Sequence, residues 1–564
     1  MISTDKSGVR AFIQACLNNN LKHFVCSPGS RNAPIVIALD EHPGIKTFVI
    51  HDERSAGFYA LGMAQQLNAP VAVVCTSGSA MLNYYPAVAE AYYQCIPLVV
   101  ISADRPQEWI NHGDGQTIVQ KGAYSNHIKY EMEVPEQLDD EFDVAKIQQQ
   151  VNSAFDACNG AWKGPIHFNL PVSEPLYNTV EVDVDDLDVR AIDIEEDEFD
   201  FSEFHDIWST SERKMIICGQ MDKNVGLLNS LSELAKDTSV AVLVENTSNL
   251  VDGRFIQCID RTLNAIEVAE IENFKPDVLV SIGGAIVSKR IKQFLRSSKI
   301  KAHWKIGFEF PEMDTYRALS KSLKCHPNTF MSRILSEYGA LNNSTFGNKW
   351  KQKDFIVQDL LPEYYENVEY SDLAVFDVVL DYLPENSLLH MGNSSVVRYC
   401  QLFDPIKSIS YFSNRGTSGI DGSLSTACGS AIIAKDKFNV MISGDVSFFY
   451  DSNALWSNYL DENLRIILIN NSGGGIFKII DGPSSTKQLN TFFVTKQEAK
   501  AEFICKAFDV EYFKANSLVE VENQMAEFYD VSKSKRPKLF EIFTPSDVND
   551  KVLKDFFQSM KTLK

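Results

Sequence analysis

The sequence lacks several patterns that would assign a protein to a common class. Its 11 cysteines are scattered from Cys16 to Cys505 without a CxxC pair, and its histidines form no HExxH motif. No strand-like run is followed by GxGxxG with an acidic residue about 20 positions later. These absences argue against a disulfide framework, a Cys/His metal site and a Rossmann-type dehydrogenase or flavin protein. They favour reduced thiols in a cytoplasm.

Positive charge and long apolar runs are also scarce. There are 53 Lys and Arg residues against 75 Asp and Glu, a formal net charge of −22. So acidic a chain is poorly suited to follow a nucleic-acid backbone or an anionic membrane surface. The longest apolar runs, such as IPLVVI and LRIILI, are shorter than the roughly 18 residues of a membrane span. The first 20 residues predict a capped amphipathic helix without a signal-peptide core.

Apolar, β-branched runs recur along all 564 residues, and each ends in small or polar residues before a helical pattern. This alternation predicts an α/β fold with three doubly wound parallel-sheet domains. Between Glu181 and Glu203 there are twelve acidic residues and one basic residue, which indicates a solvated linker. We therefore expect domains at residues 1–180, 205–345 and 346–564, joined first by an acidic linker at 181–204.

The strongest local signal lies in the last predicted domain. One strand ends at Gly444-Asp445, and the next strand ends at Asn470-Asn471, followed by a serine and three glycines. Two hard oxygen ligands on neighbouring strand ends suit Mg²⁺, whose remaining positions phosphate and water fill. The pair thus indicates a diphosphate–metal site. In the alternative interpretation, Asp and Asn merely close turns.

The GD and NN pair resembles the signature of thiamin diphosphate enzymes, although Val446 stands where that signature often has glycine. FVIHDERSAGFYALGMA supplies Glu53 at a strand end, where such enzymes carry a glutamate. SPGSR, ISADRPQEW, GQTIVQ, GNSSVVRY and NRGTSGIDG further resemble the 2-succinyl-5-enolpyruvyl-6-hydroxy-3-cyclohexene-1-carboxylate synthase family of menaquinone biosynthesis. The resemblance covers essentially the whole chain, and it implies a pyrimidine-binding first domain and a diphosphate-binding last domain.

The resemblance implies a cofactor site for thiamin diphosphate and Mg²⁺, with Mn²⁺ as a substitute. Glu53 would relay a proton to the cofactor, although without this context it is more simply a helix-start acid. Asp445, Asn471 and Gly473 would hold the metal ion. The other residues expected around the cofactor are Ile420, Gly444, Ile476 and Phe477.

Five cations follow predicted strand ends in this acidic chain: Arg31, Arg105, Lys289, Arg398 and Arg415. Such a set suits polyanionic substrates, because guanidinium groups bind carboxylates in a bidentate way. By resemblance, Arg398 and Arg415 face the carboxylate of the succinyl unit, and the other three face isochorismate. The resemblance also places Ser30, Gln116 and Ser394 near the reacting atoms and Ile480 in the apolar wall of the substrate pocket.

The resemblance implies decarboxylation of 2-oxoglutarate and conjugate addition of the succinyl carbanion equivalent to isochorismate. It also implies a homodimer, or a tetramer of paired dimers, in which Glu53 meets the metal ligands of the partner chain. One alternative is another thiamin-dependent decarboxylase or carboligase, similar to acetolactate synthase and using pyruvate. A non-catalytic thiamin-fold subunit is a third interpretation.

Overall fold

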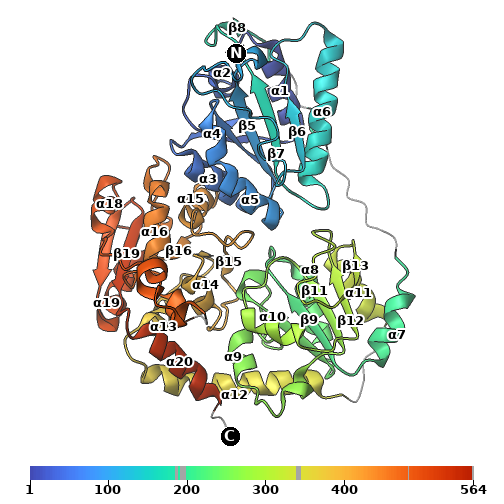
Figure 1. The fold of residues 1–564 in the computed structure, drawn as a ribbon, viewed down its shortest axis with the longest axis vertical. Coiled ribbons are helices and arrows are strands. Elements are labelled where there is room, and N and C mark those ends of the chain that lie inside the picture. The colour runs from blue at the N-terminus through green and yellow to red at the C-terminus, as the bar shows by residue number, and fades with distance from the viewer. Residues whose placement is uncertain (185–187, 191–198, 338–343, 480–481, 562–564) are drawn as a thin grey trace. The chain divides into compact units, whose positions relative to one another are not determined.

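The computed structural model describes residues 1–184, 188–190, 199–337, 344–479 and 482–561, which form two compact units (Figure 1). The first unit comprises Met1–Glu195, Asn414–Asn439 and Tyr450–Leu464. The second comprises Glu196–Ser413, Val440–Phe449 and Arg465–Lys564.

The first unit is built on a six-stranded parallel sheet in the order β3-β2-β4-β5-β7-β6. Its strands are β2 (His23–Cys26), β3 (Lys46–Val49), β4 (Val71–Cys75), β5 (Leu98–Asp104), β6 (Tyr130–Glu133) and β7 (Ile166–Pro171). The order in which the chain adds strands reverses between β2 and β4. Strand β3 is added on one side of β2, and β4 and β5 follow on the other side. In open parallel sheets ligands bind beyond the carboxyl ends of the strands at such a reversal.

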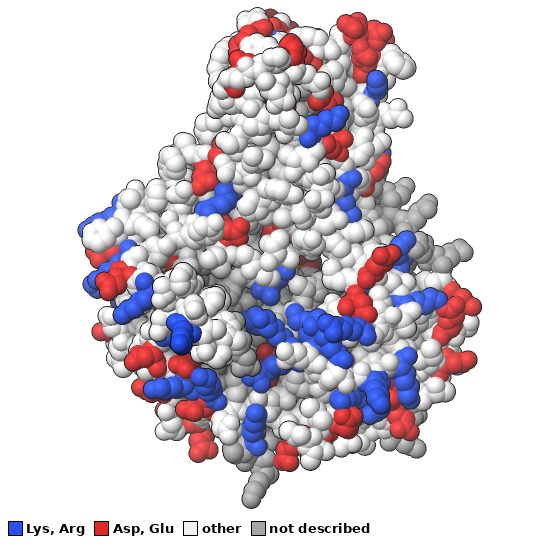
Figure 2. All heavy atoms as spheres, viewed as in Figure 1, with Lys and Arg blue, Asp and Glu red and all other residues white. Residues whose placement is uncertain are grey.

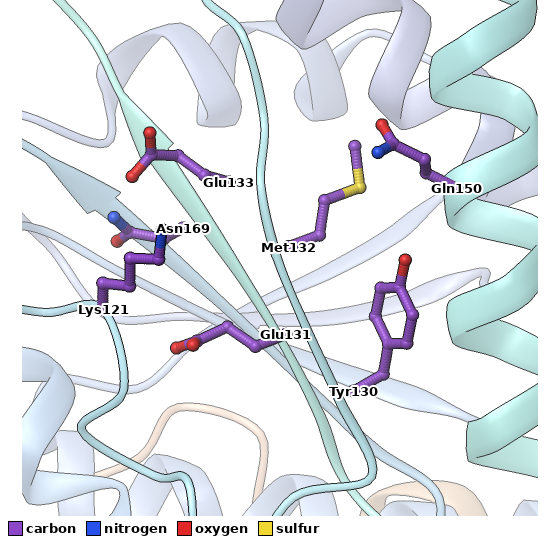
Figure 3. A pocket seen from close by; sticks show the side chains of 7 residues that line it. All are labelled: Lys121, Tyr130, Glu131, Met132, Glu133, Gln150 and Asn169. Atoms are coloured by element: carbon purple, nitrogen blue, oxygen red, sulfur yellow. The ribbon is translucent and has the colours of Figure 1, made fainter.

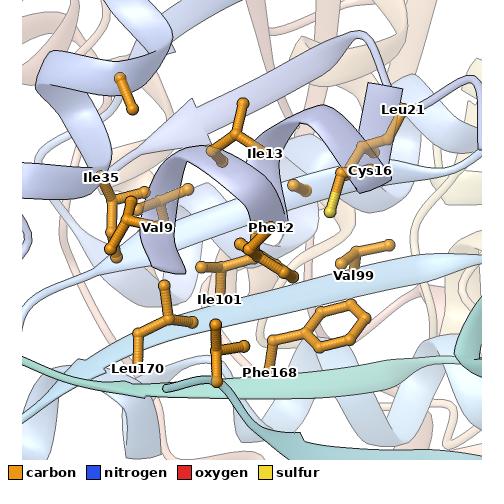
Figure 4. Close-up of a cluster of buried hydrophobic side chains, with 14 of the residues drawn as sticks. Val9, Phe12, Ile13, Cys16, Leu21, Ile35, Val99, Ile101, Phe168 and Leu170 are labelled. Atoms are coloured by element: carbon orange, nitrogen blue, oxygen red, sulfur yellow. The ribbon is translucent and has the colours of Figure 1, made fainter. Parts of the chain in front are cut away.

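Helices cover this sheet because their apolar faces have no other place to be buried. Helix α1 packs Phe12 against Phe168 of β7, with ring centroids 4.8 Å apart, within a cluster that includes Val99 and Ile101 of β5 (Figure 4). The unit's longer helices are α1 (Ser7–Asn18), α2 (Ala33–Asp40), α3 (Glu53–Leu67), α5 (Tyr85–Gln94), α6 (Glu141–Asn159) and α15 (Ser423–Ile433). Asp52 caps α3 by accepting from Arg54 N and Ser55 N, so the helix begins at Glu53.

The second unit contains two further sheets. One has the order β10-β9-β11-β12-β13, with all its pairs parallel, and the other has the order β15-β14-β16-β17-β19-β18. The first is formed by β9 (Lys214–Cys218), β10 (Val240–Val244), β11 (Val278–Ile282), β12 (Ala302–Ile306) and β13 (Leu319–Leu323). The second is formed by β14 (Leu388–Met391), β15 (Ser410–Phe412), β16 (Asn439–Gly444), β17 (Leu464–Asn470), β18 (Glu511–Ala515) and β19 (Lys538–Phe543).

Helices also flank the sheets of the second unit. Ser288 and Ser371 accept backbone N–H groups through their hydroxyls and so cap α10 and α13. The described α-helices of six or more residues here are α7 (Ser202–Thr210), α8 (Val225–Leu234), α9 (Ile259–Asn264), α10 (Lys289–Arg296), α11 (Pro327–Glu337), α12 (Phe346–Glu366), α13 (Asp372–Asp381), α14 (Ser395–Cys400), α16 (Asp445–Tyr450), α18 (Glu502–Ala507), α19 (Leu518–Tyr529) and α20 (Asn549–Lys561).

The N-terminus differs from its predicted form. Residues Ile2–Thr4 form β1, which pairs antiparallel with β8 (Thr179–Glu181), so the helix begins only at Ser7. Lys6 stands at the N-cap and gives no side-chain cap, so the predicted capping is wrong. Pairing with a strand nearly 180 residues away was not visible in the local pattern.

The predicted linker at 181–204 is only partly described, since residues 185–187 and 191–198 lie outside the described ranges. Its described residues are mostly exposed, but some of them also make ordered contacts. Val182 N donates to Met1 O, Arg190 forms an ion pair with Asp156, and α7 begins at Ser202. The acidic composition of this segment therefore did not indicate the end of β8 or the start of α7.

The three sheets with flanking helices confirm the predicted α/β fold class. The predicted domain boundaries stay a prediction. None of the helices within the described ranges combines the length and low polarity needed to cross a bilayer.

Candidate active site

Arg31 and Arg105 lie close together at the strand ends of the first unit. Arg31 follows β2, is 2 % exposed, donates from Nη1 to Val172 O at 3.0 Å and pairs with Glu174 at 3.1 Å. The guanidinium carbons of Arg31 and Arg105 lie 5.8 and 5.7 Å from the centroid of the same Trp109 ring. The indole thus gathers two cations at one edge of the sheet. Sequence reasoning did not single out Trp109, although it lies in the quoted ISADRPQEW motif.

The backbone of Arg105 is held by Asp104, the last residue of β5. The Asp104 carboxylate accepts from Arg105 N at 2.7 Å and from Asn169 Nδ2 at 2.8 Å. Burial raises the pKa of Asp104 to about 6, against the opposing hydrogen bond from Asn169. Arg105 itself donates from Nη2 to Gly115 O at 3.2 Å, which joins it to the loop that carries Gln116.

Gln116 and Ser30 are exposed on loops at the same edge of the sheet. Ser77 Oγ, just after β4, donates to Gln116 O at 2.9 Å. Next to Ser30, Arg31 N donates to Thr76 Oγ1 at 3.3 Å. The structure therefore brings Ser30, Arg31, Arg105 and Gln116 to neighbouring loops, and for the two arginines this follows from their positions after strands.

Glu53 is the first residue of α3 and is partly buried. Desolvation raises the pKa of its carboxyl, and the neighbouring charge of Asp52 acts in the same direction. The backbone N–H of Glu53 and the side chain of Asn83 hydrogen-bond to the carboxylate and lower the pKa in part. A raised pKa makes the protonated form of this carboxyl easier to populate, which is the direction that a proton relay requires.

Arg415 and Ile420 lie in the first unit, on the loop before α15, and are partly buried. The loop is fastened by Glu90 of α5, a carboxylate that is 1 % exposed. Glu90 accepts from Gly416 N at 2.6 Å, from Thr417 N at 2.7 Å and from Thr417 Oγ1 at 2.5 Å. Sequence reasoning missed this contact because its two sides are more than 320 residues apart.

In the second unit, Asp445 starts α16 directly after Gly444 of β16 and is 2 % exposed. Its carboxylate accepts from Gln497 Nε2 at 2.6 Å and from Val446 N at 2.8 Å, and Gly473 N also hydrogen-bonds to it. Burial nevertheless raises the pKa of Asp445 to about 6. A cation beside this carboxylate would favour its charged form.

Asn471 and Gly473 adjoin Asp445, as the strand-end pattern predicts. Asn471 Nδ2 donates to Asp372 Oδ2 at 2.9 Å, so the amide oxygen is the atom available to a metal ion. Gly473 has φ +142°, and a Cβ there would lie 2.5 Å from Val494 O. One carboxylate, one amide and a glycine backbone fit Mg²⁺, which prefers few protein ligands. Within the described residues no cluster of three His, Cys, Asp or Glu side chains could hold a metal ion instead.

The apolar residues after the glycine run fall in the short helix α17 (Ile476–Ile479). Ile476 is 8 % exposed, and the Phe477 ring lies 5.7 Å from that of Phe493. Lys478 of the same helix is partly buried, and its Nζ donates to Ser546 O at 2.7 Å. Ile480 lies outside the described residues.

Lys289, Ser394 and Arg398 lie at strand ends of the second unit. Ser394 has φ +73° at the start of α14, which carries Arg398, and Lys289 is the exposed first residue of α10. Figure 2 shows Lys and Arg side chains gathered over the region of α10.

Two acids connect Arg398 with the start of α10. The charges of Asp260 and Glu245 raise the pKa of Arg398 and oppose the larger lowering by burial. Glu245 accepts from Val287 N at 2.7 Å and from Ser288 N at 2.8 Å, and Ser288 Oγ donates to Asp260. These acids hold the turn that precedes Lys289, and sequence reasoning did not identify either of them.

Comparisons with known proteins identify the family of this chain. Residues 6–124 match the family model "Thiamine pyrophosphate enzyme, N-terminal TPP binding domain", and residues 195–391 match "Middle domain of thiamine pyrophosphate". Curated 2-succinyl-5-enolpyruvyl-6-hydroxy-3-cyclohexene-1-carboxylate synthases from Flavobacterium psychrophilum and Flavobacterium johnsoniae are each 42% identical over 98% of both chains. The one from Porphyromonas gingivalis is 35% identical over 98% of this chain and 97% of its own. The predictions of a thiamin diphosphate enzyme and a transferase are thereby confirmed. The chain belongs to the 2-succinyl-5-enolpyruvyl-6-hydroxy-3-cyclohexene-1-carboxylate synthase family.

Proposed function

We propose that the protein removes CO₂ from 2-oxoglutarate and adds the remaining succinyl unit to the ring alkene of isochorismate, as a step of menaquinone biosynthesis. The observation that carries this proposal is the sequence similarity, over 98% of the chain, to synthases named for the product of this reaction. The paired guanidinium groups of Arg31 and Arg105 at Trp109 support it, because they suit a ligand with more than one carboxylate.

The residues of the second unit would hold the metal ion and the diphosphate. Asp445 and Asn471 would bind Mg²⁺ through their side-chain oxygens, and Gly473 through its backbone. We expect Mn²⁺ to substitute, because the ligands are hard oxygens. Gly444 and the side chains of Ile420, Ile476 and Phe477 would line the cofactor pocket. When bound, thiamin diphosphate supplies the electron sink for decarboxylation.

Glu53 would hold a proton at its carboxyl and exchange it with the cofactor ring. Its raised pKa supports this role, since the protonated and ionised forms then lie closer in free energy at neutral pH. Gln116 and Ser394 would act as polar groups at the reacting atoms.

The cations would bind and orient the two substrates. We assign Arg398 and Arg415 to the carboxylate of the succinyl unit. We assign Arg31, Arg105 and Lys289 to isochorismate, together with Ser30 and the apolar Ile480. Orientation of two reactants in this way can lower a barrier by about 7–11 kcal/mol in favourable cases.

We further propose a homodimer in which Glu53 of one chain serves the metal site of the other, with a tetramer as the larger alternative. We also propose that the chain has three domains, with an acidic linker between the first two, and that it is located in the cytoplasm.

The test mixes purified protein with thiamin diphosphate, Mg²⁺, 2-oxoglutarate and isochorismate, and follows isochorismate loss and CO₂ release. We expect isochorismate consumption that requires 2-oxoglutarate and both cofactors. Pyruvate in place of 2-oxoglutarate is the control. CO₂ release from pyruvate with isochorismate untouched would instead favour an acetolactate-synthase-like carboligase.

A further inference from the structure

Gln120, at the end of the GQTIVQ segment, is a buried side chain that joins three strand ends of the first unit. It is 0 % exposed and lies on neither a helix nor a strand. Its Oε1 accepts from Gly78 N at 2.8 Å, just after β4. Its Nε2 donates to Asn169 Oδ1 of β7 at 2.8 Å and to Ala103 O of β5 at 3.1 Å, and Ser102 Oγ lies 3.3 Å away.

Each strand end that Gln120 contacts leads to a residue of the proposed site, either Gln116 near the reacting atoms or an arginine assigned to isochorismate. Gly78 follows Ser77, whose hydroxyl holds Gln116 O. Asn169 also donates to Asp104, whose carboxylate holds Arg105 N. Beyond Asn169, Val172 N donates to Asp104 O at 3.1 Å, and Val172 O accepts from Arg31.

The network continues away from the site to the edge strand of the sheet. Ser102 Oγ bonds to Asn169 Oδ1 at 2.9 Å and to His167 Nε2 at 2.7 Å, and His167 Nδ1 lies 3.0 Å from Glu131 Oε1. Asn169 and Glu131 also line a cavity of about 210 Å³, which Figure 3 shows with its other lining residues, Lys121, Tyr130, Met132, Glu133 and Gln150. The side-chain amides of Gln120 and Asn169 thus have hydrogen-bond partners toward the site and toward the edge strand. These partners fix the position of Gln120.

We propose that Gln120 is a positioning residue that sets the relative geometry of Arg31, Arg105 and Gln116. Loss of its amide would leave Ala103 O, Asn169 Oδ1 and Gly78 N short of a buried partner, so the three loops would shift independently. Carboxylate binding by two guanidinium forks is sensitive to such shifts, because it depends on their mutual orientation. The proposal rests on the proposed function, since it assumes that Arg31 and Arg105 bind isochorismate.

The experiment compares the full-length wild-type protein with Gln120→Met, which keeps the approximate size and removes the amide. Gln120→Asn keeps an amide that is one methylene too short, and it carries the test where the Met variant does not fold. The matched control is Asn19→Leu in the same unit. Asn19 is 6 % exposed and donates to Ala15 O at 2.9 Å and to Asn152 Oδ1 at 2.8 Å, away from the strand ends of the site.

The measurements are KM for each substrate, kcat, the melting temperature, and isochorismate binding by calorimetry. We expect the Gln120 variants to raise KM and Kd for isochorismate at least tenfold. We expect KM for 2-oxoglutarate to stay within twofold and the melting temperature to match that of Asn19→Leu. Equal losses for both substrates, or isochorismate parameters like those of the control, would overturn the positioning role. Failure of the wild-type protein to consume isochorismate would instead refute the proposed function.

Discussion

At the scale of single residues, Glu53 and Glu141 occupy the same position in their helices. Each directly follows an aspartate whose side chain caps the helix. Glu141 is exposed, whereas Glu53 is partly buried and has a pKa raised by that burial. Position in the helix therefore explains the presence of an acid at both sites, and only the surroundings of Glu53 suit a proton relay.

We expect Glu53→Gln to lower turnover by at least about 10²-fold, because an amide cannot exchange the proton. Thiamin diphosphate binding, measured by calorimetry, should change little. Glu141→Gln is the control and should keep wild-type turnover. Full activity of the Glu53→Gln protein would remove the proton-relay assignment.

Asp451 is a second residue with an unusual environment. It is 0 % exposed, and burial raises its pKa to about 7, although Ser425 N and Ser425 Oγ donate to it at 2.8 Å each and Arg54 lies 3.7 Å away. The charge of Asp421 raises the pKa further. Because the folded pKa exceeds the unfolded value of about 3.9, the folded state binds this proton more tightly.

The stability that this proton confers is fully present below about pH 4 and is lost as the pH rises through the folded pKa, about 7. We expect the free energy of unfolding of the Asp451→Asn protein to lack this pH-dependent loss, which is on the order of 4 kcal/mol at most. Denaturation curves between pH 4 and 8 measure it. The control is Asp461→Asn at a partly exposed residue, which removes a surface pair with Lys435. An unchanged pH dependence in Asp451→Asn would contradict the assignment.

At the scale of elements, the helices α3 and α15 approach each other closely within the first unit. A Cβ at Gly62 of α3 would lie 2.0 Å from Thr426 O, and a Cβ at Gly429 of α15 would lie 2.0 Å from Tyr59 O. Alanine normally stabilises a helix relative to glycine. Here the two backbones leave no room, and the contact fixes α15 against the helix that begins at Glu53.

We therefore expect Gly429→Ala to destabilise the protein by about 1–3 kcal/mol, as overpacking does. Urea denaturation measures the change. Gly253→Ala is the control, because a Cβ there meets nothing within 4 Å. A Gly429→Ala protein as stable as the wild type would mean that the helices can separate without cost.

Polar strands were harder to predict than apolar ones. Strands β4 and β5 and the edge strand β10 are continuous apolar runs of the kind that the sequence pattern predicts. The polar edge strands β6 (YEME), β13 (LSKSL) and β18 (EYFKA) do not fit that pattern, and neither does the central strand β12 (AHWKI). An edge strand is partly solvated, so its sequence need not be apolar.

At the scale of the whole molecule, the proposed dimer shares its sites between chains. A mixture of Glu53→Gln and Asp445→Asn proteins, each inactive alone, tests this sharing. Half of the dimers in a random mixture are hybrids, and each hybrid would contain one intact site. We expect roughly a quarter of wild-type activity after denaturation and joint refolding. Jointly refolded wild-type protein is the control.

Activity no higher than that of the separate variants would contradict sharing between chains. In that case Glu53 and Asp445 would serve a site within one chain, where a hybrid repairs neither fault. Sedimentation of the same samples distinguishes this outcome from a failure to form dimers.

The sequence by itself determined which residues stand at strand ends and which functional groups they present. Asp445 and Asn471 follow apolar runs of one sheet, and Arg31 and Arg105 follow apolar runs of another. A parallel sheet brings such positions to the same edge of that sheet. The motifs SPGSR, ISADRPQEW and NRGTSGIDG indicated the family, and the comparisons confirm it.

Only the tertiary structure decided what holds those residues in place. Trp109 between two arginines, Glu90 on the Arg415 loop, Asp372 on Asn471 and Gln120 across three strands are contacts made through space. Buried polar groups must find partners, but the partners come from any part of the chain that packing brings near. A local sequence pattern indicates which strand a residue follows but not which side chain it contacts. These supporting side chains could therefore be identified only from the fold.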